Sequence, residues 1–245
     1  MSRLISDMLI TCQFKDPTHQ SGDFAEMLRR MHIITKLLAQ KSEGLTQWFS
    51  QGESIDDARL YPAFDGAEAS TALLAVLNQE YRLDKSFTAI SIWNGADEQR
   101  DSVVLELQGN NRNRPCSLTI SYHKRRDDRF GGADSVKDIV TTMAHLFSAQ
   151  YISVSPRYYD EKQVFDDKPG VGWMLYLPQV ITANQVPEAQ ALIPVPAAGK
   201  KQTGTIIVSV SDEVFSLDNP RHVESANHIE MRLVDQDLLP RYADL

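Results

Sequence analysis

Two short acidic triplets between residues 160 and 168 carry the residue types most able to do chemistry. They are Asp160-Glu161-Lys162 and Asp166-Asp167-Lys168. In a metal-dependent nuclease, carboxylates in such a triplet hold Mg²⁺ and the lysine positions the attacking water. A site of that kind needs a strand and a further acid from a hairpin, whereas both triplets lie between Pro156 and Pro169, which predicts a loop. The triplets leave two hypotheses, a metal-dependent hydrolase and a solvated acidic loop.

The same segment also has the composition of a binding surface. Tyrosine is enriched at the energetic centres of protein interfaces, and acids around it select a basic partner. The alternative is that the two tyrosines pack on the edge of a sheet. The candidate partner-binding residues are Tyr158, Tyr159, Asp160, Glu161, Asp166 and Asp167.

Other patterns that could bind a phosphate or a metal are incomplete. Gly199-Lys200-Lys201 lacks the upstream glycine and the hydroxyl of a phosphate-binding loop. His222 and His228 are separated by six positions, so on a helix they point in different directions and do not share a metal. We therefore expect no catalytic residue, no metal site and no cofactor, and predict that the protein is not an enzyme.

The charge and hydropathy of the chain limit the classes of partner that it can bind and indicate its cellular compartment. Its 245 residues carry a net charge of −8, which argues against direct binding to nucleic acid and favours attraction to a basic protein. No apolar run approaches the ~18 residues of a membrane span, and the first residues lack a signal-peptide pattern. We expect a cytoplasmic protein that does not bind membranes, in which Cys12 and Cys116 are buried small hydrophobes.

In the first half of the chain, helical patterns precede strand patterns. A strand is predicted over residues 8–14, and apolar residues at helical spacing predict a helix over 23–40. Ser54 is a candidate cap for a short helix, and a further helix contains Leu73 and Leu77. Period-two alternation then predicts an antiparallel meander of three strands, over residues 87–93, 102–108 and 117–123.

The second half begins with a helix that Ser135 and Asp138 would cap and that continues to Phe147. Strands are predicted over 151–155 and 173–177, and residues 179–203 form a long irregular connection. The stretch from Gly204 to Leu233 then predicts a central buried strand followed by a helix. Asn219 would cap this last helix, with Pro220 at its first position.

Blocks of helices and strands in this order indicate an α+β fold with largely antiparallel sheet and flanking helices. We predict one domain over residues 1–245. An alternative within it is a pair of related α/β halves, residues 1–130 and 131–245, packed as one unit around Gly131-Gly132.

Several short phrases stand out along most of the chain. They are Leu45-Thr46-Gln47-Trp48, Ile92-Trp93-Asn94-Gly95, Val171-Gly172-Trp173-Met174-Leu175-Tyr176-Leu177-Pro178, Gly204-Thr205-Ile206-Ile207-Val208, Ala226-Asn227-His228-Ile229-Glu230 and Leu238-Leu239-Pro240. Taken together and in this order, they resemble the immunity protein 52 family of bacterial polymorphic-toxin systems.

What this resemblance implies is an immunity protein, or antitoxin, that neutralises a cognate toxin by binding it and so serves in bacterial competition. Partners of the family are usually restriction-endonuclease-like nucleases, often delivered by type VI secretion. The family offers no catalytic residues to transfer to this chain. The partner-binding residues named above therefore rest on their own chemistry alone.

Overall fold

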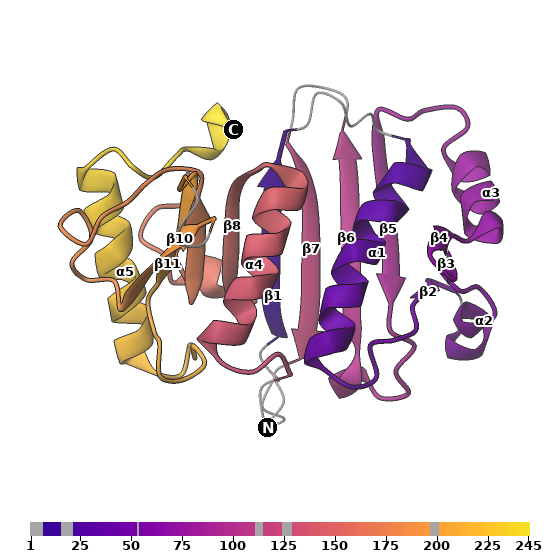
Figure 1. Cartoon of the computed structure of the whole chain (residues 1–245), viewed down its shortest axis with the longest axis horizontal. Helices are drawn as coiled ribbons and strands as arrows, with labels where there is room; N and C mark the ends of the chain where they lie inside the picture. Colours follow the sequence, from indigo (N-terminus) through magenta and orange to yellow (C-terminus); the bar gives the residue numbers. More distant parts are fainter. Residues whose placement is uncertain (1–6, 16–21, 53, 111–114, 124–128, 197–200) are drawn as a thin grey trace.

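The structure is a computed structural model that describes residues 7–15, 22–52, 54–110, 115–123, 129–196 and 201–245. Its main element is a nine-stranded antiparallel sheet in the order β10-β11-β9-β8-β1-β7-β6-β5-β2, which confirms the α+β class (Figure 1). The strands of this sheet are β1 (Asp7–Phe14), β2 (Phe49–Ser50), β5 (Phe87–Trp93), β6 (Val103–Asn110), β7 (Cys116–His123), β8 (Ala149–Pro156), β9 (Met174–Leu177), β10 (Ala191–Val195) and β11 (Gly204–Val208).

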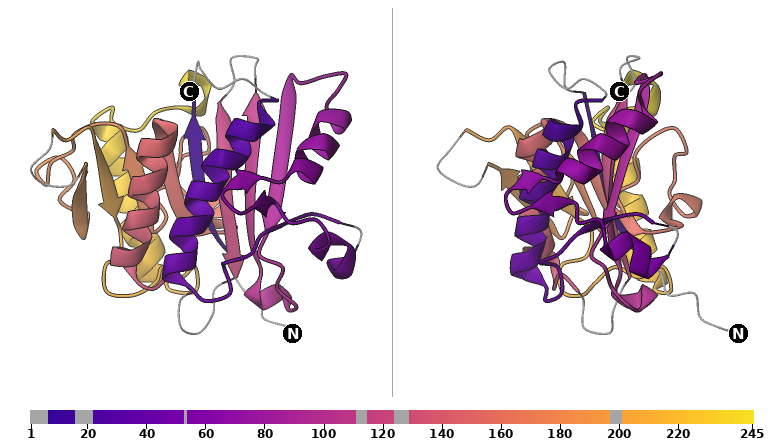
Figure 2. Two further views of the ribbon diagram at one scale, coloured as in Figure 1. Left: turned by 45° about the vertical axis from the view of Figure 1, so that its right-hand side comes forward. Right: turned by 90° about the vertical axis from the view of Figure 1, so that its right-hand side faces the viewer.

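Helices lie on both faces of the sheet but cover them unequally. Helices α1 and α4 lie side by side on one face, and α5 lies on the opposite face near the β9–β11 end (Figures 1 and 2). Helices α2 and α3 and the two-stranded hairpin β3-β4 lie at the end of the sheet that β5 and β2 form. Their bounds are α1 (Phe24–Lys41), α2 (Ile55–Arg59), β3 (Phe64–Asp65), β4 (Glu68–Ala69), α3 (Thr71–Glu80), α4 (Ala133–Phe147) and α5 (Pro220–Asp235).

The unequal cover agrees with the burial pattern along the strands. Residues of β6 and β7 alternate strictly between buried and half-buried, as expected where one face packs on helices and the other is open. Strands β9 and β11 are buried at every position, because both of their faces are covered. The sequence shows the same contrast, since β11 reads Gly-Thr-Ile-Ile-Val whereas β7 alternates apolar and polar residues.

The prediction of a central strand at Gly204–Val208 is wrong, although a strand does form there. Strand β11 is second from the edge, and β1 occupies the middle, paired with β7 on one side and β8 on the other. The expected irregular connection over 179–203 also contains β10, which pairs with β11. Continuous apolar residues indicate burial on two faces, but not the position of a strand in its sheet.

Most predicted helix boundaries are confirmed by their caps. The Asn219 side chain accepts a hydrogen bond from the Arg221 amide, and Pro220 occupies the first helical position of α5. The Ser54 hydroxyl likewise accepts from the Asp57 amide at the start of α2. The predicted cap of α4 by Ser135 and Asp138 is wrong, because the helix begins after Gly132 without a side-chain cap, and both side chains accept hydrogen bonds from Lys41 of α1.

An acidic residue near the start of α1 is held by two arginines on its own helix. Glu26 accepts charge-assisted hydrogen bonds from Arg29 at 2.6 Å and Arg30 at 2.7 Å. The guanidinium of Arg29, aided by that of Arg30, lowers the pKa of the Glu26 carboxyl to about 2. Glu26 therefore stays ionised well into the acid range.

One sheet and one core include strands from both halves of the chain. Strand β1 of the first half pairs with β8 of the second along almost its whole length. Cys12 and Cys116 are buried in this core as free thiols, as expected. Whether residues 1–130 and 131–245 are related units stays a prediction.

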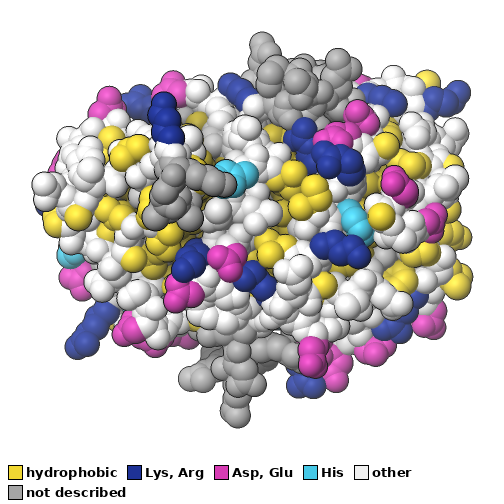
Figure 3. Space-filling view, viewed as in Figure 1, with side chains coloured by type: hydrophobic (Ala, Val, Ile, Leu, Met, Phe, Trp, Pro, Cys, Tyr) yellow, Lys and Arg dark blue, Asp and Glu magenta, His cyan; other side chains and the backbone are white. Residues whose placement is uncertain are grey.

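The face covered by α1 and α4 has basic and acidic side chains interspersed over it (Figure 3). Lys41 of α1 bridges to Asp138 of α4 at 2.9 Å and ties the two helices together. Within the described part of the chain, no helix combines the length and apolarity that crossing a membrane requires. The connection between β6 and β7 includes residues 111–114, which lie outside the described ranges.

Candidate partner-binding surface

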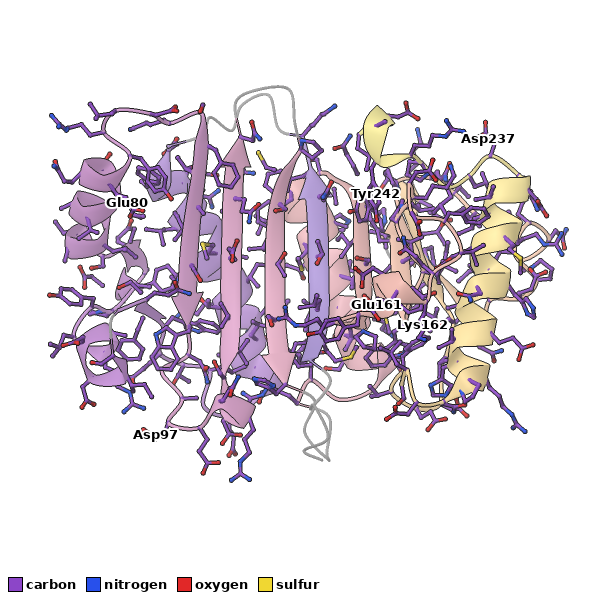
Figure 4. The ribbon with its side chains drawn as sticks, turned by 180° about the vertical axis from the view of Figure 1, so that it is seen from behind. Glu80, Asp97, Glu161, Lys162, Asp237 and Tyr242 are labelled. Atoms are coloured by element: carbon purple, nitrogen blue, oxygen red, sulfur yellow. The ribbon has the colours of Figure 1, made fainter. Side chains whose placement is uncertain are left out.

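Residues 157–167, here called the acidic segment, follow β8 and lie in the connection from β8 to β9. They contain the short 3₁₀ helix η2 (Tyr159–Glu161). Seen from the side opposite α1, Glu161 and Lys162 lie between the open strands and α5 (Figure 4). The segment also contacts the open strands directly, because Arg157 donates a hydrogen bond to the Ser121 hydroxyl of β7 at 3.3 Å.

The two tyrosines of the segment point in opposite directions. Tyr158 has a left-handed backbone with φ of 73° and a side chain that is 54% exposed. Tyr159 is buried, and its ring meets Phe215 edge to face with centroids 5.5 Å apart. Tyr158 is thus available to a partner, whereas Tyr159 anchors the segment to the core, as in the alternative that the sequence left open.

A buried carboxylate, Glu230 of α5, holds the acidic segment in place. Its Oε1 accepts hydrogen bonds from the Tyr159 hydroxyl at 2.7 Å and the Val171 amide at 2.8 Å. Its Oε2 accepts from the Val164 amide at 2.7 Å. One side chain thus satisfies two backbone amides and one phenol of a loop, and it replaces the strand partners that the two amides lack.

Burial raises the pKa of Glu230, and its three hydrogen bonds offset only part of that effect. The same burial, together with the neighbouring Glu230, raises the pKa of the Tyr159 hydroxyl, which stays protonated and remains a donor. The contact between them is therefore a directed hydrogen bond from phenol to carboxyl.

Sequence reasoning did not identify Glu230, although a signal was present. Ala226, Ile229 and Leu233 form the buried stripe of α5, and Glu230 lies within this stripe at helical spacing. An acid on the apolar face of an amphipathic helix is buried and needs hydrogen-bond donors. That position predicts a structural carboxylate, but the sequence does not indicate which loop supplies the donors.

The far end of the acidic segment is fixed by the C-terminal residues. The Lys168 ammonium donates to the Leu239 carbonyl at 2.9 Å, and the Tyr242 amide donates to the Asp167 carbonyl at 2.9 Å. Asp167 also lies 3.6 Å from Arg241. The segment is consequently held at both ends and along its middle.

Four acids of the segment are exposed on this fixed backbone, namely Asp160, Glu161, Asp166 and Asp167. Within the described residues, Asp160, Glu161 and Asp166 have no Lys or Arg partner, so their charges are available to a second molecule. The structure thus places Tyr158 and these acids on one solvent-facing segment, while Tyr159 faces inward.

The hydrolase hypothesis needs at least three metal-ligating side chains to converge. Across the described ranges, no group of three His, Cys, Asp or Glu residues does so. Lys168, the lysine of the second triplet, has its ammonium on the Leu239 carbonyl and is not directed at the acids. No specific observation therefore favours a metal-dependent site in this segment.

Comparison with known proteins places the chain in a class of binding proteins. The family model described as "Immunity protein 52" matches residues 19–241. The chain therefore belongs to the immunity protein 52 family, and the resemblance predicted from its phrases is confirmed. Family membership supports an immunity role, which implies binding to a cognate toxin.

Two further comparisons add less. No curated protein sequence matches the chain. Among solved structures, it is similar to a protein described as "Pseudomonas aeruginosa T6SS protein PA0821", with a TM-score of 0.47 and 9% identity. That similarity covers 91% of this chain and 77% of the other.

Proposed function

We propose that the protein is a cytoplasmic immunity protein that binds a cognate nuclease toxin and protects the bacterium that produces both. The toxin would be a restriction-endonuclease-like effector of the type VI secretion kind that the family resemblance implies. The observation that carries the proposal is the acidic segment, in which exposed carboxylates without cationic partners are held on a fixed backbone, in a chain of the immunity protein 52 family.

Electrostatics support a nuclease as the partner. A nuclease presents a positive surface to the phosphates of its substrate, and a chain with a net charge of −8 is attracted to such a surface. Steering of this kind raises association rates to the order of 10⁸–10⁹ M⁻¹s⁻¹ at low salt. Asp160, Glu161 and Asp166 add a local concentration of negative charge beside the exposed Tyr158.

The fixed backbone of the segment supports tight binding. Because Glu230 and the C-terminal residues already hold it, complex formation does not have to order these residues. Binding could block the catalytic site of the toxin, cover its nucleic-acid groove, or prevent its assembly.

Co-expression with the toxin encoded beside this gene tests the proposal. We expect the cells to survive and the two proteins to co-purify as a complex. Replacing Tyr158 and Asp160 together by alanine should weaken binding, by about 10-fold or more, without lowering the melting temperature. The control variant Glu43→Ala, at an exposed acid just after α1, should bind as the wild type does.

Cell death despite abundant folded protein, with no complex recovered, would refute the function itself. Unchanged affinity of the folded double variant would instead remove the acidic segment from the interface. These two results can be told apart because the first is read with the wild-type chain.

A further inference from the structure

The strands β5, β6, β7 and β1 leave one face of the sheet without a helix, here called the uncovered face. Figure 4 looks directly onto it, with Glu80 of α3 on one side and Glu161 and Lys162 of the acidic segment on the other. In the middle of this face, small or polar side chains lie across the strands in register, and the neighbouring row contains the apolar Trp93, Val104 and Leu9. Two rows of small or polar side chains are Ser91, Glu106, Thr119 and Thr11, and Ala89, Gln108, Ser117 and Gln13.

These side chains are half-buried, while the alternate residues of the same strands form the core. These two rows form a largely polar floor onto which the surface of another protein can be laid. The floor is bounded on the β8 side by the acidic segment, where Arg157 contacts Ser121. On the β5 side it is bounded by α3.

A hollow of about 460 Å³ lies where α3 meets β5 and β6 at the edge of this face. Its apolar wall includes Val76 and Leu77 of α3 and the ring of Tyr61, and its floor includes Ser91. Val76 is 54% exposed and Tyr61 48% exposed, so the hollow opens to solvent. Exposed apolar side chains that gather around a hollow are typical of protein-binding sites.

Two carboxylates, Glu80 and Glu106, line the same hollow, and its lining includes no Lys or Arg. Within the described residues neither acid forms an ion pair, and Glu106 accepts a hydrogen bond from the side-chain Nε2 of Gln108 at 2.5 Å. An apolar wall beside unpaired acids fits a long basic side chain. The methylene stem of Lys or Arg packs on the wall while its charged head meets the carboxylates.

We propose that the toxin docks on the uncovered face and places a Lys or Arg of its nucleic-acid-binding surface into the hollow between Glu80 and Glu106. The occupant is assigned by charge complementarity and by the shape of the hollow. This assignment rests on the proposed immunity function. It extends the interface from the acidic segment across the sheet, so that acids at both borders of the face meet one basic surface.

Binding of the purified toxin to charge-reversal variants of the full chain tests the assignment. The variant Glu80→Lys/Glu106→Lys should bind the toxin at least about 30-fold more weakly, because the Lys or Arg of the toxin would then meet two positive charges in the hollow. The matched control is Glu43→Lys/Glu68→Lys, which changes the net charge equally at exposed acids on the α1 side. The control should retain affinity within about 3-fold at 150 mM salt.

A second variant, which only removes the two charges, is needed because lysine at Glu106 on its strand can also lower stability. Glu80→Gln/Glu106→Gln keeps side-chain shape and an acceptor for Gln108, and should weaken binding by about 10-fold with an unchanged melting temperature. Wild-type affinity for both hollow variants would overturn the docking site, as would equal losses in the hollow and control variants. If the wild-type chain itself fails to bind the toxin, the proposed function fails before the docking site is tested.

Discussion

The two ends of the sheet differ in how many faces of their strands are covered. At the β9–β11 end both faces are covered, and every residue of β9 and β11 is buried. At the β5–β7 end α1 covers one face and the other remains open, so buried and half-buried residues alternate. The difference indicates that the covered end supplies stability and that the open end supplies surface. One substitution on each kind of strand tests that division.

The largest effect is expected in the covered end. Ile207 of β11 is fully buried, so Ile207→Ala should lower the free energy of unfolding by about 2–5 kcal/mol. Thr119 of β7 is half-buried on the uncovered face, and Thr119→Ala should cost less than about 1 kcal/mol. Urea denaturation of both variants measures the contrast. Similar losses at the two positions would show that the uncovered face belongs to the core.

An intermediate effect is expected where the acidic segment meets α5. Glu230→Gln puts an amide donor against groups that are themselves donors, and should cost about 1–3 kcal/mol. Hydrogen exchange of the Val164 and Val171 amides should accelerate, while amides of β6 stay protected. The exposed Glu224→Gln on the same helix is the control and should change neither measurement.

The pH dependence of that variant gives a second test of the same contact. Burial raises the pKa of Glu230 in the folded protein, so the folded state holds its proton to higher pH than the unfolded chain. The stabilising contribution is full below the ordinary value of 4.5 and declines as pH rises through the folded value. Glu230→Gln should remove this decline, and an unchanged pH profile would contradict the assignment.

The smallest effect is expected at Glu26, near the start of helix α1, which covers one face of the sheet. The pKa of Glu26 is lowered to about 2, so its contribution is present above the ordinary value of 4.5 and is lost as pH falls toward 2. Glu26→Gln should reduce stability at pH 7 by less than about 1 kcal/mol and flatten the acid limb of the unfolding curve. A steeper acid limb in the variant would show the opposite sign and refute the coupling to Arg29.

Local patterns were sufficient to predict most elements of the fold. The period-two alternation of β5 to β7 and the caps at Ser54 and Asn219 are short-range signals, and the structure confirms them. The order of strands depends on pairing between distant residues, which periodicity does not encode. For that reason the sequence placed β11 at the centre, whereas β1 lies there.

The candidate partner-binding surface also has features that local sequence predicts and features that it does not. The composition of residues 158–167 indicated exposed acids, and four of them are exposed. Which tyrosine faces inward depends on Glu230, which lies 71 positions from Tyr159 in the chain. The hollow beside α3 also combines Tyr61, Val76 and Glu106, which come together only once β5 and β6 are paired. Long-range contacts of this kind leave no local pattern.

The central position of β1 has a consequence for protein synthesis. Its residues leave the ribosome before those of its neighbours β7 and β8, which end at His123 and Pro156. At a translation rate of ~5–20 residues per second, β1 waits roughly 5–20 s for its first sheet partner. The nascent chain therefore cannot pair the middle strand of its sheet on both sides until Pro156 has been translated.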